Sequence, residues 1–437
     1  MGYGTNHLTI ELSGLTAYAR VFRDDPGWQG MDPGGPAFEG WLAAYLDRFM
    51  AYMDDGGYWP ESDGPAQGYN SLTANSLLRA AIDLGRMDRQ LKRFRAAARF
   101  HVVNTLPDLM STGLMDGRNG RLPVLVRTSF CGLIPEGRPL VDAVARLNLA
   151  ESTRPEGRVS GETMNELLTD LLAGPWFAPA GPSVWEPRDL THTVRNDWAV
   201  LKRGPWIAAA CNIPFRARPE GHWNLDYQNL FMLHHCEAGT ILNGNHGKND
   251  PEMATFHKRF DTFDGKPVPP VWVHLPGAGR LETRGDGFRL WRDYRGFEGT
   301  VAIAFADDHT AVIRLSAAAR LAEYPVMCAL QPAVGFGGCF HDASGRAIAV
   351  TAAPFVLNGA DLGGALVFAP ARGPGADPAA EGRPVRMSLP EDAMLVWPYK
   401  PWDCYNLKTD RHTHPSGWVP VVHVPVGPAG AELTVRV

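Results

Sequence analysis

A run of glycine and proline between residues 174 and 182 divides the sequence into two parts with different hydrophobic periodicity. No regular helix or strand continues through such a composition. Apolar residues recur at helical spacing before the run and at alternate positions after it. With 437 residues, the chain is also too long for one ordinary core. We therefore expect an α+β protein of two domains, with helices in residues 1–178 and antiparallel strands in residues 183–437.

Helical spacing is clearest in five stretches of the first part. Leu8, Leu12 and Leu15 begin the pattern, and further helices are predicted over residues 38–50, 71–84, 88–103 and 163–172. Gly85 follows one of these stretches at the position where a glycine commonly ends a helix. Glycine and proline cluster between the stretches, which indicates helices joined by shaped loops rather than a coiled coil.

Short runs with period two dominate the second part. They are rich in alanine, valine and isoleucine and predict strands over residues 198–202, 206–210, 300–305, 311–315, 347–350 and 365–368. Residues 307–310 read as a hairpin turn between two of these strands. Many short strands in succession are typical of antiparallel sheets in a sandwich.

Composition and charge exclude several classes of protein. The net charge is −5 and no block of Lys and Arg stands out, which argues against a nucleic-acid-binding protein. No apolar run is long enough to cross a membrane, and the first residues lack the basic and apolar regions of a signal peptide. The six cysteines form no Cys-x-x-Cys pair, so neither a zinc knuckle nor a dense disulfide framework is indicated.

Polar side chains that suit a ligand site alternate along residues 221–231. His222, Asn224 and Asp226 would place imidazole, amide and carboxylate groups on one side of a strand. Such a strand could form the wall of a site, or it could be a buried edge whose polar groups bond only to one another. The segment 239–244, with Asn243, follows as the returning strand of a hairpin.

A second unusual stretch is the loop before the helix predicted at 71–84. It contains Tyr58, Trp59, Glu61, Asp63 and Tyr69. Flat aromatic rings beside carboxylates suit a sugar, and loops of this kind often carry function. The alternative is a surface loop whose aromatic rings cap the core.

Three further groups have ordinary structural explanations as well as functional ones. The imidazole of His7, in the pair Asn6-His7, could be a ligand or a base, or a structural group whose hydrogen bonds are satisfied. The cationic turn around Arg118 could neutralise a carboxylate, or could be a solvated loop. A set of four histidines could bind a metal, but their spacing matches no tight zinc pattern: His234, His235, His246 and His257.

Taken together, these motifs resemble the heparinase II/III-type polysaccharide lyases of the chondroitin AC/alginate lyase superfamily. Asn6-His7 at the start of a helix resembles the Asn-His pair that this family places at the uronate carboxylate. The stretch from Glu61 to Tyr69 resembles its loop with a catalytic tyrosine. Residues 221–231 and 239–244 resemble its His-x-His-x-Asp strand and Gly-x-x-Leu-x-Asp-x-Gly return. The resemblance covers about residues 1–260, with the sandwich following.

The resemblance implies a fold, an activity and a set of site residues. The fold is an incomplete (α/α) toroid followed by an antiparallel β-sandwich, and the activity is β-elimination at a 4-linked uronic acid. It implies catalytic roles for Tyr69, His222, Asn6 and His7, with the base either His222 or Tyr69, and Tyr58 in reserve. The residues implied in substrate binding are Arg118, Glu61, Tyr58, Trp59 and Trp223.

The resemblance also implies what the chain would bind. The partner is a uronate-containing oligosaccharide or polysaccharide, with no nucleic acid and no membrane, while self-association is left open. No cofactor is required, and Asn224 and Asn243 stand where two ligands of a structural metal in some relatives would be, which argues against that metal here. Relatives of this kind are periplasmic or secreted bacterial proteins.

Two other functions fit the same residues. A glycoside hydrolase would use Glu61 and Asp63 as general acid and base. A carbohydrate-binding protein without catalysis would use Trp59, Trp223 and Trp402 as stacking platforms.

Overall fold

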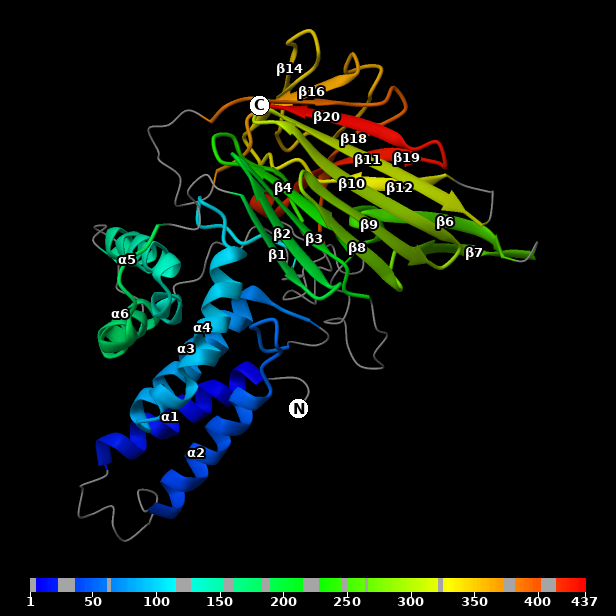
Figure 1. Ribbon diagram of the computed structural model, residues 1–437. Coiled ribbons are helices and arrows are strands. Elements are labelled where there is room, and N and C mark those ends of the chain that lie inside the picture. Colours follow the sequence, from blue (N-terminus) through cyan, green and yellow to red (C-terminus); the bar gives the residue numbers. More distant parts are fainter. Residues whose placement is uncertain are drawn as a thin grey trace. The chain divides into compact units, whose positions relative to one another are not determined.

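The helices precede the strands along the chain (Figure 1). The computed structural model describes residues 5–22, 36–60, 64–114, 127–152, 161–182, 189–214, 228–244, 250–263, 266–320, 325–372, 382–401 and 414–437. The residues group into two compact units. The first consists of Met1–Ser111 and Leu122–Glu186, and the second of Thr112–Arg121 and Pro187–Val437.

The regular structure of the first unit consists of helices joined by turns and loops. Its α-helices are α1 (Thr5–Phe22), α2 (Pro36–Ala51), α3 (Gln67–Asp83), α4 (Met87–Val103), α5 (Arg138–Ser152) and α6 (Gly161–Ala173). Gly85 has a φ of +63° and ends α3, with the backbone N–H of Arg86 donating to the carbonyl oxygen of Ala81. The predicted helices are therefore confirmed, whereas α5 had no separate prediction.

The second unit contains three antiparallel sheets. The first sheet has the order β1 (Leu190–Val194), β2 (Trp198–Arg203), β3 (Trp206–Cys211), β4 (Phe231–His235), β5 (Gly239–Leu242). The second has the order β14 (Ala347–Ala349), β13 (Cys339–His341), β16 (Ala365–Phe368), β17 (Val385–Ser388), β20 (Ala431–Arg436), β11 (Thr310–Ala319), β10 (Phe297–Asp307), β9 (Gly287–Tyr294), β8 (Gly279–Arg284). The third has the order β15 (Phe355–Asn358), β18 (Met394–Tyr399), β19 (Val419–Val426), β12 (Val326–Leu330), β6 (Phe256–Phe263), β7 (Lys266–Val273).

One hydrophobic core joins the three sheets. It includes Leu201 of β2, Phe288 of β9 and Val422 of β19, each at most 2% exposed. Strands β9 to β11 alternate buried and exposed residues, as expected for a sheet with one face on the core. The α+β prediction is confirmed, and so is the hairpin turn between β10 and β11.

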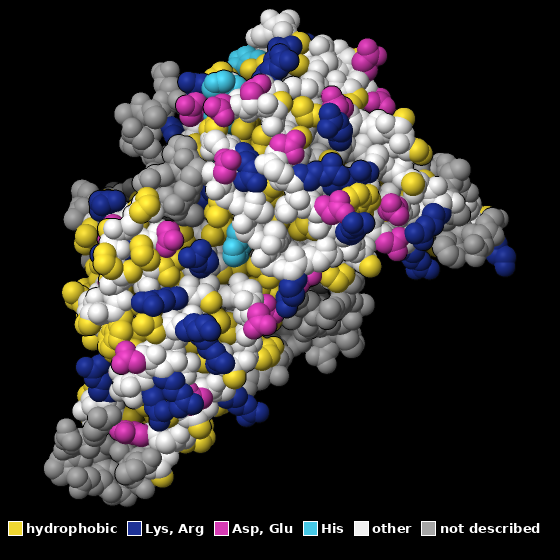
Figure 2. Space-filling model, in the orientation of Figure 1, with side chains coloured by type: hydrophobic (Ala, Val, Ile, Leu, Met, Phe, Trp, Pro, Cys, Tyr) yellow, Lys and Arg dark blue, Asp and Glu magenta, His cyan; other side chains and the backbone are white. Residues whose placement is uncertain are grey.

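The surface matches the charge balance of the sequence. On the face drawn in Figure 2, Lys and Arg side chains are interspersed with Asp and Glu side chains. Among the described residues, no helix combines the length and the apolar character needed to span a membrane.

Candidate functional site

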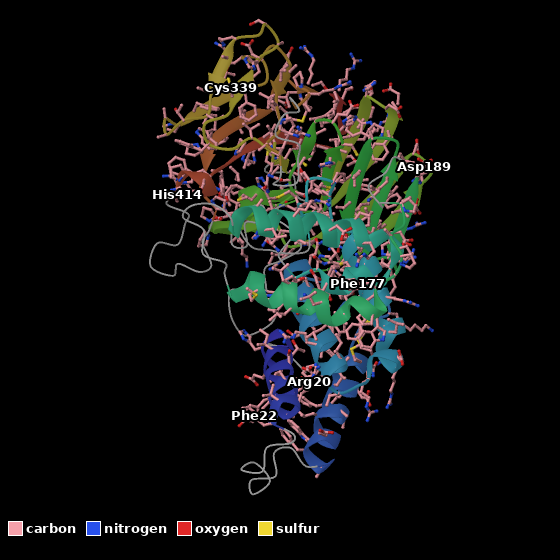
Figure 3. All side chains as sticks on the ribbon, turned by 90° about the vertical axis from the view of Figure 1, so that its left-hand side faces the viewer. Arg20, Phe22, Phe177, Asp189, Cys339 and His414 are labelled. Carbon is pink, nitrogen blue, oxygen red and sulfur yellow. The ribbon has the colours of Figure 1, made fainter. Side chains whose placement is uncertain are left out.

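Helices α1 and α3 lie side by side and run in the same direction. Arg20, near the end of α1 (Figure 3), donates a hydrogen bond of 2.8 Å from Nη1 to Oδ1 of Asp83, the last residue of α3. The two helices have 18 and 17 residues. Because an α-helix rises a constant 1.5 Å per residue, their first turns also lie at one end.

A cavity of about 280 Å³ opens along the line where α1, α3 and α6 meet. Its lining residues follow the same side-by-side pairing of α1 and α3. Ile10 and Leu72, like Ala17 and Arg79, are separated in the sequence by almost the same number of residues as Arg20 and Asp83. The lining residues are Ile10, Ser13, Gly14, Ala17, Leu72, Asn75, Ser76, Arg79, Arg127, Glu166 and Thr169.

The same offset sets Asn6 and His7 level with Tyr69. His7 precedes Ile10 by about one helical turn, and Tyr69 precedes Leu72 by about one turn, so these two positions fall on the faces of α1 and α3 that border the cavity. The side chain of Asn6 lies outside the described part of the chain. His7 is exposed and Tyr69 is half-buried. The first turns of α1 and α3, which contain His7 and Tyr69, therefore lie at the same end of the cavity.

A buried carboxyl group closes the inner side of the cavity. Glu166 of α6 is 4% exposed. Its Oε1 accepts hydrogen bonds from the backbone N–H of Thr128 and from the N–H and hydroxyl of Ser129, the last two at 2.9 Å. Its Oε2 accepts one from Nδ2 of Asn75 at 2.6 Å. These bonds hold α3, α6 and the segment before η1 (Ser129–Leu133) together.

The carboxyl group that borders the cavity is mostly uncharged at neutral pH. Burial raises the pKa of Glu166 to about 8, and the neighbouring carboxylate of Asp170 acts in the same direction, against the hydrogen bonds from Ser129 and Thr128. The guanidinium groups of Arg79 and Arg127 line the same space. Because Glu166 is mostly protonated at neutral pH, its carboxyl group adds little negative charge beside these two side chains.

The pKa of Glu166 predicts a pH-dependent effect of Glu166→Gln. A carboxyl group whose pKa rises from 4.5 to about 8 on folding stabilises the protein most below pH 4.5, and that contribution is lost as the pH rises through 8. We expect the difference in the free energy of unfolding, native protein minus Glu166→Gln, to decrease as the pH rises from 5 to 8. The decrease should be up to about 1.4 kcal/mol per pH unit. Denaturant unfolding at several pH values measures this difference. Glu11→Gln, on the exposed face of α1, is the control, and a pH-independent difference for Glu166→Gln would contradict the prediction.

Tyr58 and Trp59 lie inside the helical unit. Tyr58 is 4% exposed and packs against Phe100, with ring centroids 5.2 Å apart. Trp59 is 2% exposed and donates from Nε1 to the carbonyl oxygen of Phe49. Their burial favours the alternative that these rings cap the core.

Several predicted site residues lie outside the described part of the chain. Among the catalytic candidates this applies to His222, and the remaining ones are Glu61, Asp63, Arg118, Trp223, Asn224, Asp226, His246 and Trp402. The predicted returning strand is confirmed as β5, which pairs antiparallel with β4. Of the predicted strand 221–231, residues 221–227 lie outside the described part of the chain, and residues 228–230 are not in a strand. Asn243 follows β5, and its backbone N–H donates to the carbonyl oxygen of Gln331. The side chain of Asn243 is an amide, which is not among the usual zinc ligands.

Solved structures with the same arrangement of elements are polysaccharide lyases. A heparinase III gene product matches 100% of this chain with a TM-score of 0.55 at 11% identity. A second heparinase III matches 99% with 0.51 at 10% identity, and the heparan sulfate lyase from Pedobacter heparinus matches 100% with 0.51 at 10% identity. The chain has the heparinase III fold. It spans 59% to 61% of the length of these three structures. No protein-family model and no curated protein sequence matches the chain.

In this heparinase III fold, a buried arginine anchors the chain just before the segment with His222. Arg292 of β9 is 0% exposed. Its Nη1 donates to the carbonyl and side-chain oxygens of Asn212, each at 2.6 Å, and its Nη2 donates to the carbonyl oxygen of Ile213 at 2.7 Å. Arg292 therefore anchors the backbone at Asn212 and Ile213, directly after β3.

Sequence reasoning missed the residues that close the cavity. Glu166 and Thr169 lie in the predicted helix 163–172, where with Asp170 they form a polar stripe at helical spacing. Arg79 lies in the predicted helix 71–84. The stripe was visible in the sequence, but nothing in the sequence indicated that it faces α1 and α3.

Proposed function

We propose that the protein is a polysaccharide lyase that cleaves a 4-linked uronic-acid-containing glycan by β-elimination. Its helices would form an incomplete (α/α) toroid and its sheets an antiparallel β-sandwich. The likeness in fold to a heparinase III and a heparan sulfate lyase over the whole of this chain supports the reaction class. The two arginines in the lining of the cavity, Arg79 and Arg127, suit an anionic sugar as the ligand.

The first task of such an enzyme is to neutralise the C6 carboxylate of the uronate. The C5 proton is weakly acidic, and removing it places negative charge on the enolate-like carboxylate. The amide of Asn6 and the imidazole of His7 are suitable donors, with Arg118 as an additional cation. Donors held in place before the reaction lower the barrier because they need not reorganise as the charge develops.

Two proton transfers complete the reaction. A base takes the C5 proton, the electron pair of the C5–H bond forms the C4=C5 double bond, and the C4–O4 bond breaks. Tyr69 would donate its phenolic proton to the departing O4. The base is His222 or Tyr69 itself, according to the face of the sugar that carries the C5 proton.

One observation carries the assignment of these roles. The parallel pairing of α1 and α3, which share the ion pair between Arg20 and Asp83, supports the proposal that Asn6 and His7 act together with Tyr69. Elimination needs one group that donates hydrogen bonds to the C6 carboxylate and another that donates a proton to O4 of the same sugar. Because α1 and α3 begin at the same level, their first turns would supply both groups within one small region.

A panel of uronate polysaccharides tests the proposal. Elimination leaves a conjugated double bond, so ultraviolet absorbance should rise with time for at least one polymer, with heparan sulfate as the first member of the panel. Cleavage without a rise in absorbance would support the hydrolase that uses Glu61 and Asp63. Binding without cleavage would support a carbohydrate-binding protein, although the burial of Trp59 removes one of its stacking platforms.

We expect lyase activity to survive exhaustive chelation. No step of the proposed reaction needs a metal, and amides replace two of the ligands that some relatives use, at Asn224 and Asn243. The measurement is the initial rate before and after treatment with a chelator, well below the melting temperature. Complete loss of activity that zinc alone restores would contradict this prediction.

A further inference from the structure

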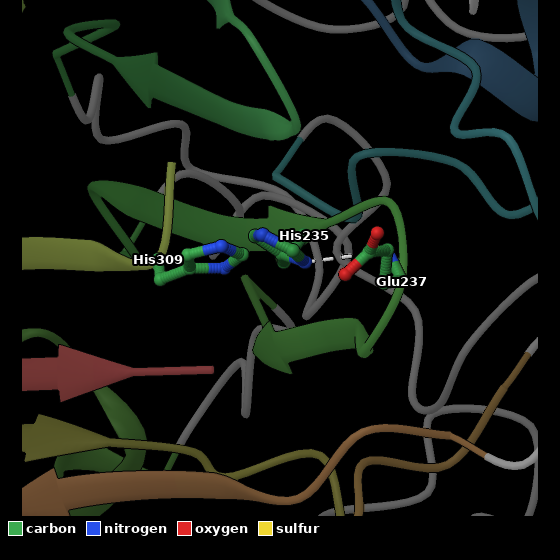
Figure 4. Close-up of side chains that lie close together, drawn as sticks. All are labelled: His235, Glu237 and His309. Atoms are coloured by element: carbon green, nitrogen blue, oxygen red, sulfur yellow. Dashed lines mark hydrogen bonds between the residues drawn. The ribbon is translucent and has the colours of Figure 1, made fainter. Parts of the chain in front are cut away.

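Two turns at the edge of the second unit bring together two imidazoles and one carboxylate. Among the described residues, His235, Glu237 and His309 form a group whose ligand atoms all lie within 4.8 Å of one another. His235 ends β4, Glu237 lies in the turn between β4 and β5, and His309 lies in the turn between β10 and β11. In Figure 4 the ring of His235 lies between the ring of His309 and the carboxylate of Glu237.

We propose that His235, Glu237 and His309 bind one Zn²⁺-class transition metal ion, which joins the β4–β5 turn to the β10–β11 turn. Two imidazole nitrogens and one carboxylate oxygen form a ligand set that suits zinc and its first-row neighbours, whereas Ca²⁺ and Mg²⁺ prefer oxygen ligands. The turns belong to different sheets, so the ion would be a structural link between the five-stranded and nine-stranded sheets.

The tautomer of His235 is already the one that a metal requires. Its Nε2 lies 3.0 Å from the carbonyl oxygen of Asp308 and must donate to it, because a carbonyl oxygen only accepts. The lone pair is therefore on Nδ1, which accepts a long contact of 3.3 Å from the backbone N–H of Glu237. A histidine ligand commonly donates its second ring N–H to a backbone carbonyl in this way.

The ligand from the second turn is held by several contacts. The indole N–H of Trp206 donates to the carbonyl oxygen of Asp307, and the backbone N–H of His309 donates to Oδ1 of Asp307 at 2.8 Å. The backbone N–H of Val437 donates to the carbonyl oxygen of His309 at 3.0 Å. Trp206 also packs edge-on against His235, with ring centroids 4.7 Å apart. One tryptophan thus supports both turns.

Only small side-chain movements separate this group from a coordination shell. Tetrahedral zinc with bonds of about 2.1 Å places its ligand atoms about 3.4 Å apart. His235 is buried and fixed, while Glu237 and His309 are exposed and free to rotate toward it. The fourth position faces solvent and would take a water molecule.

One cation competes for the same carboxylate. Nη1 of Arg383 lies 3.0 Å from Oε2 of Glu237, and both side chains are about half exposed, at 51% and 50%. Such an exposed ion pair is weak, so a metal ion can displace it. The affinity for metal should therefore rise when Arg383 is removed.

Metal binding to the whole protein, stripped of metal, tests the proposal. Co²⁺ is the spectroscopic probe, because its visible absorption is intense in a tetrahedral site, and Zn²⁺ displacement by calorimetry gives the stoichiometry. We expect one ion per chain and a melting temperature that rises with Zn²⁺. Glu237→Gln and His309→Ala should each weaken binding by about tenfold or more, and Arg383→Ala should strengthen it.

Two control variants make the ligand set falsifiable. His341→Ala removes a histidine of β13 outside the group and should bind as the native protein does. Cys236→Ser removes the thiol between two of the proposed ligands and should also keep the binding. Loss of binding in Cys236→Ser, equal binding in all variants, or no saturable binding to the native protein would overturn the proposal.

Discussion

Tyr69→Phe should lower the turnover of the proposed lyase by about two to four orders of magnitude. Phenylalanine keeps the ring and its packing in the first turn of α3 but removes the only proton that this side chain can transfer. Substrate binding should change far less, because the substitution leaves the cations and donors of the groove in place. The measurement is a comparison of kcat and KM with the polymer that gives the largest rise in absorbance.

Tyr58→Phe is the matched control for this loss. Tyr58 is the other tyrosine of the same sequence stretch, but its ring is buried against Phe100. The control should retain turnover within a fewfold of the native protein. Near-normal turnover in Tyr69→Phe, or a larger loss in Tyr58→Phe, would move the proton donor away from Tyr69. His222→Ala should resemble Tyr69→Phe, while His234→Ala should cost much less.

Arg292→Met should lower the free energy of unfolding by about 3 kcal/mol. The side chain of Arg292 is fully buried and satisfies three oxygen atoms of Asn212 and Ile213. Methionine fills a similar volume but leaves these acceptors without donors in the interior. Each orphaned acceptor carries a desolvation cost, partly offset because a buried cation is removed as well.

Denaturant unfolding with Arg289→Met as the control measures this effect. Arg289 lies on the same strand but is exposed, so its substitution should change the unfolding free energy by about 0.5 kcal/mol or less. Arg292→Lys should fall between the two, because an ammonium group keeps the charge and loses the planar fork. Equal effects of Arg289→Met and Arg292→Met would contradict the anchoring role of Arg292.

The sequence predicted elements wherever a local pattern specified them. The apolar stripe of residues 38–50 lies in α2, Gly85 ends α3, and the turn at 307–310 joins β10 to β11. Their signals are local, because helical spacing, a positive φ and a two-residue period are each written in neighbouring residues. The pairing of β11 with β20 has no such signal, since nearly half of the second unit lies between the two strands in the sequence.

Local patterns predicted only part of the candidate site. Asn6, His7 and Tyr69 belong to local motifs, so the sequence could single them out. The common level of the first turns of α1 and α3 depends on a pairing that includes Arg20 and Asp83, two charged residues 63 apart that no local pattern connects. Tyr58 and Trp59 show the opposite case, because the same loop composition suits both a sugar platform and a core cap, and only their burial distinguishes these.

The most direct measurement of the central claim is the mass of the cleavage products from a uronate-containing oligosaccharide of defined length. Elimination adds no water, so the masses of the two fragments should sum to the mass of the substrate. The fragment that carries the new non-reducing end should be lighter by one water than the corresponding saturated sugar. Fragments whose masses sum to that of the substrate plus one water would show hydrolysis and would contradict the assignment of Asn6, His7 and Tyr69 to a β-elimination.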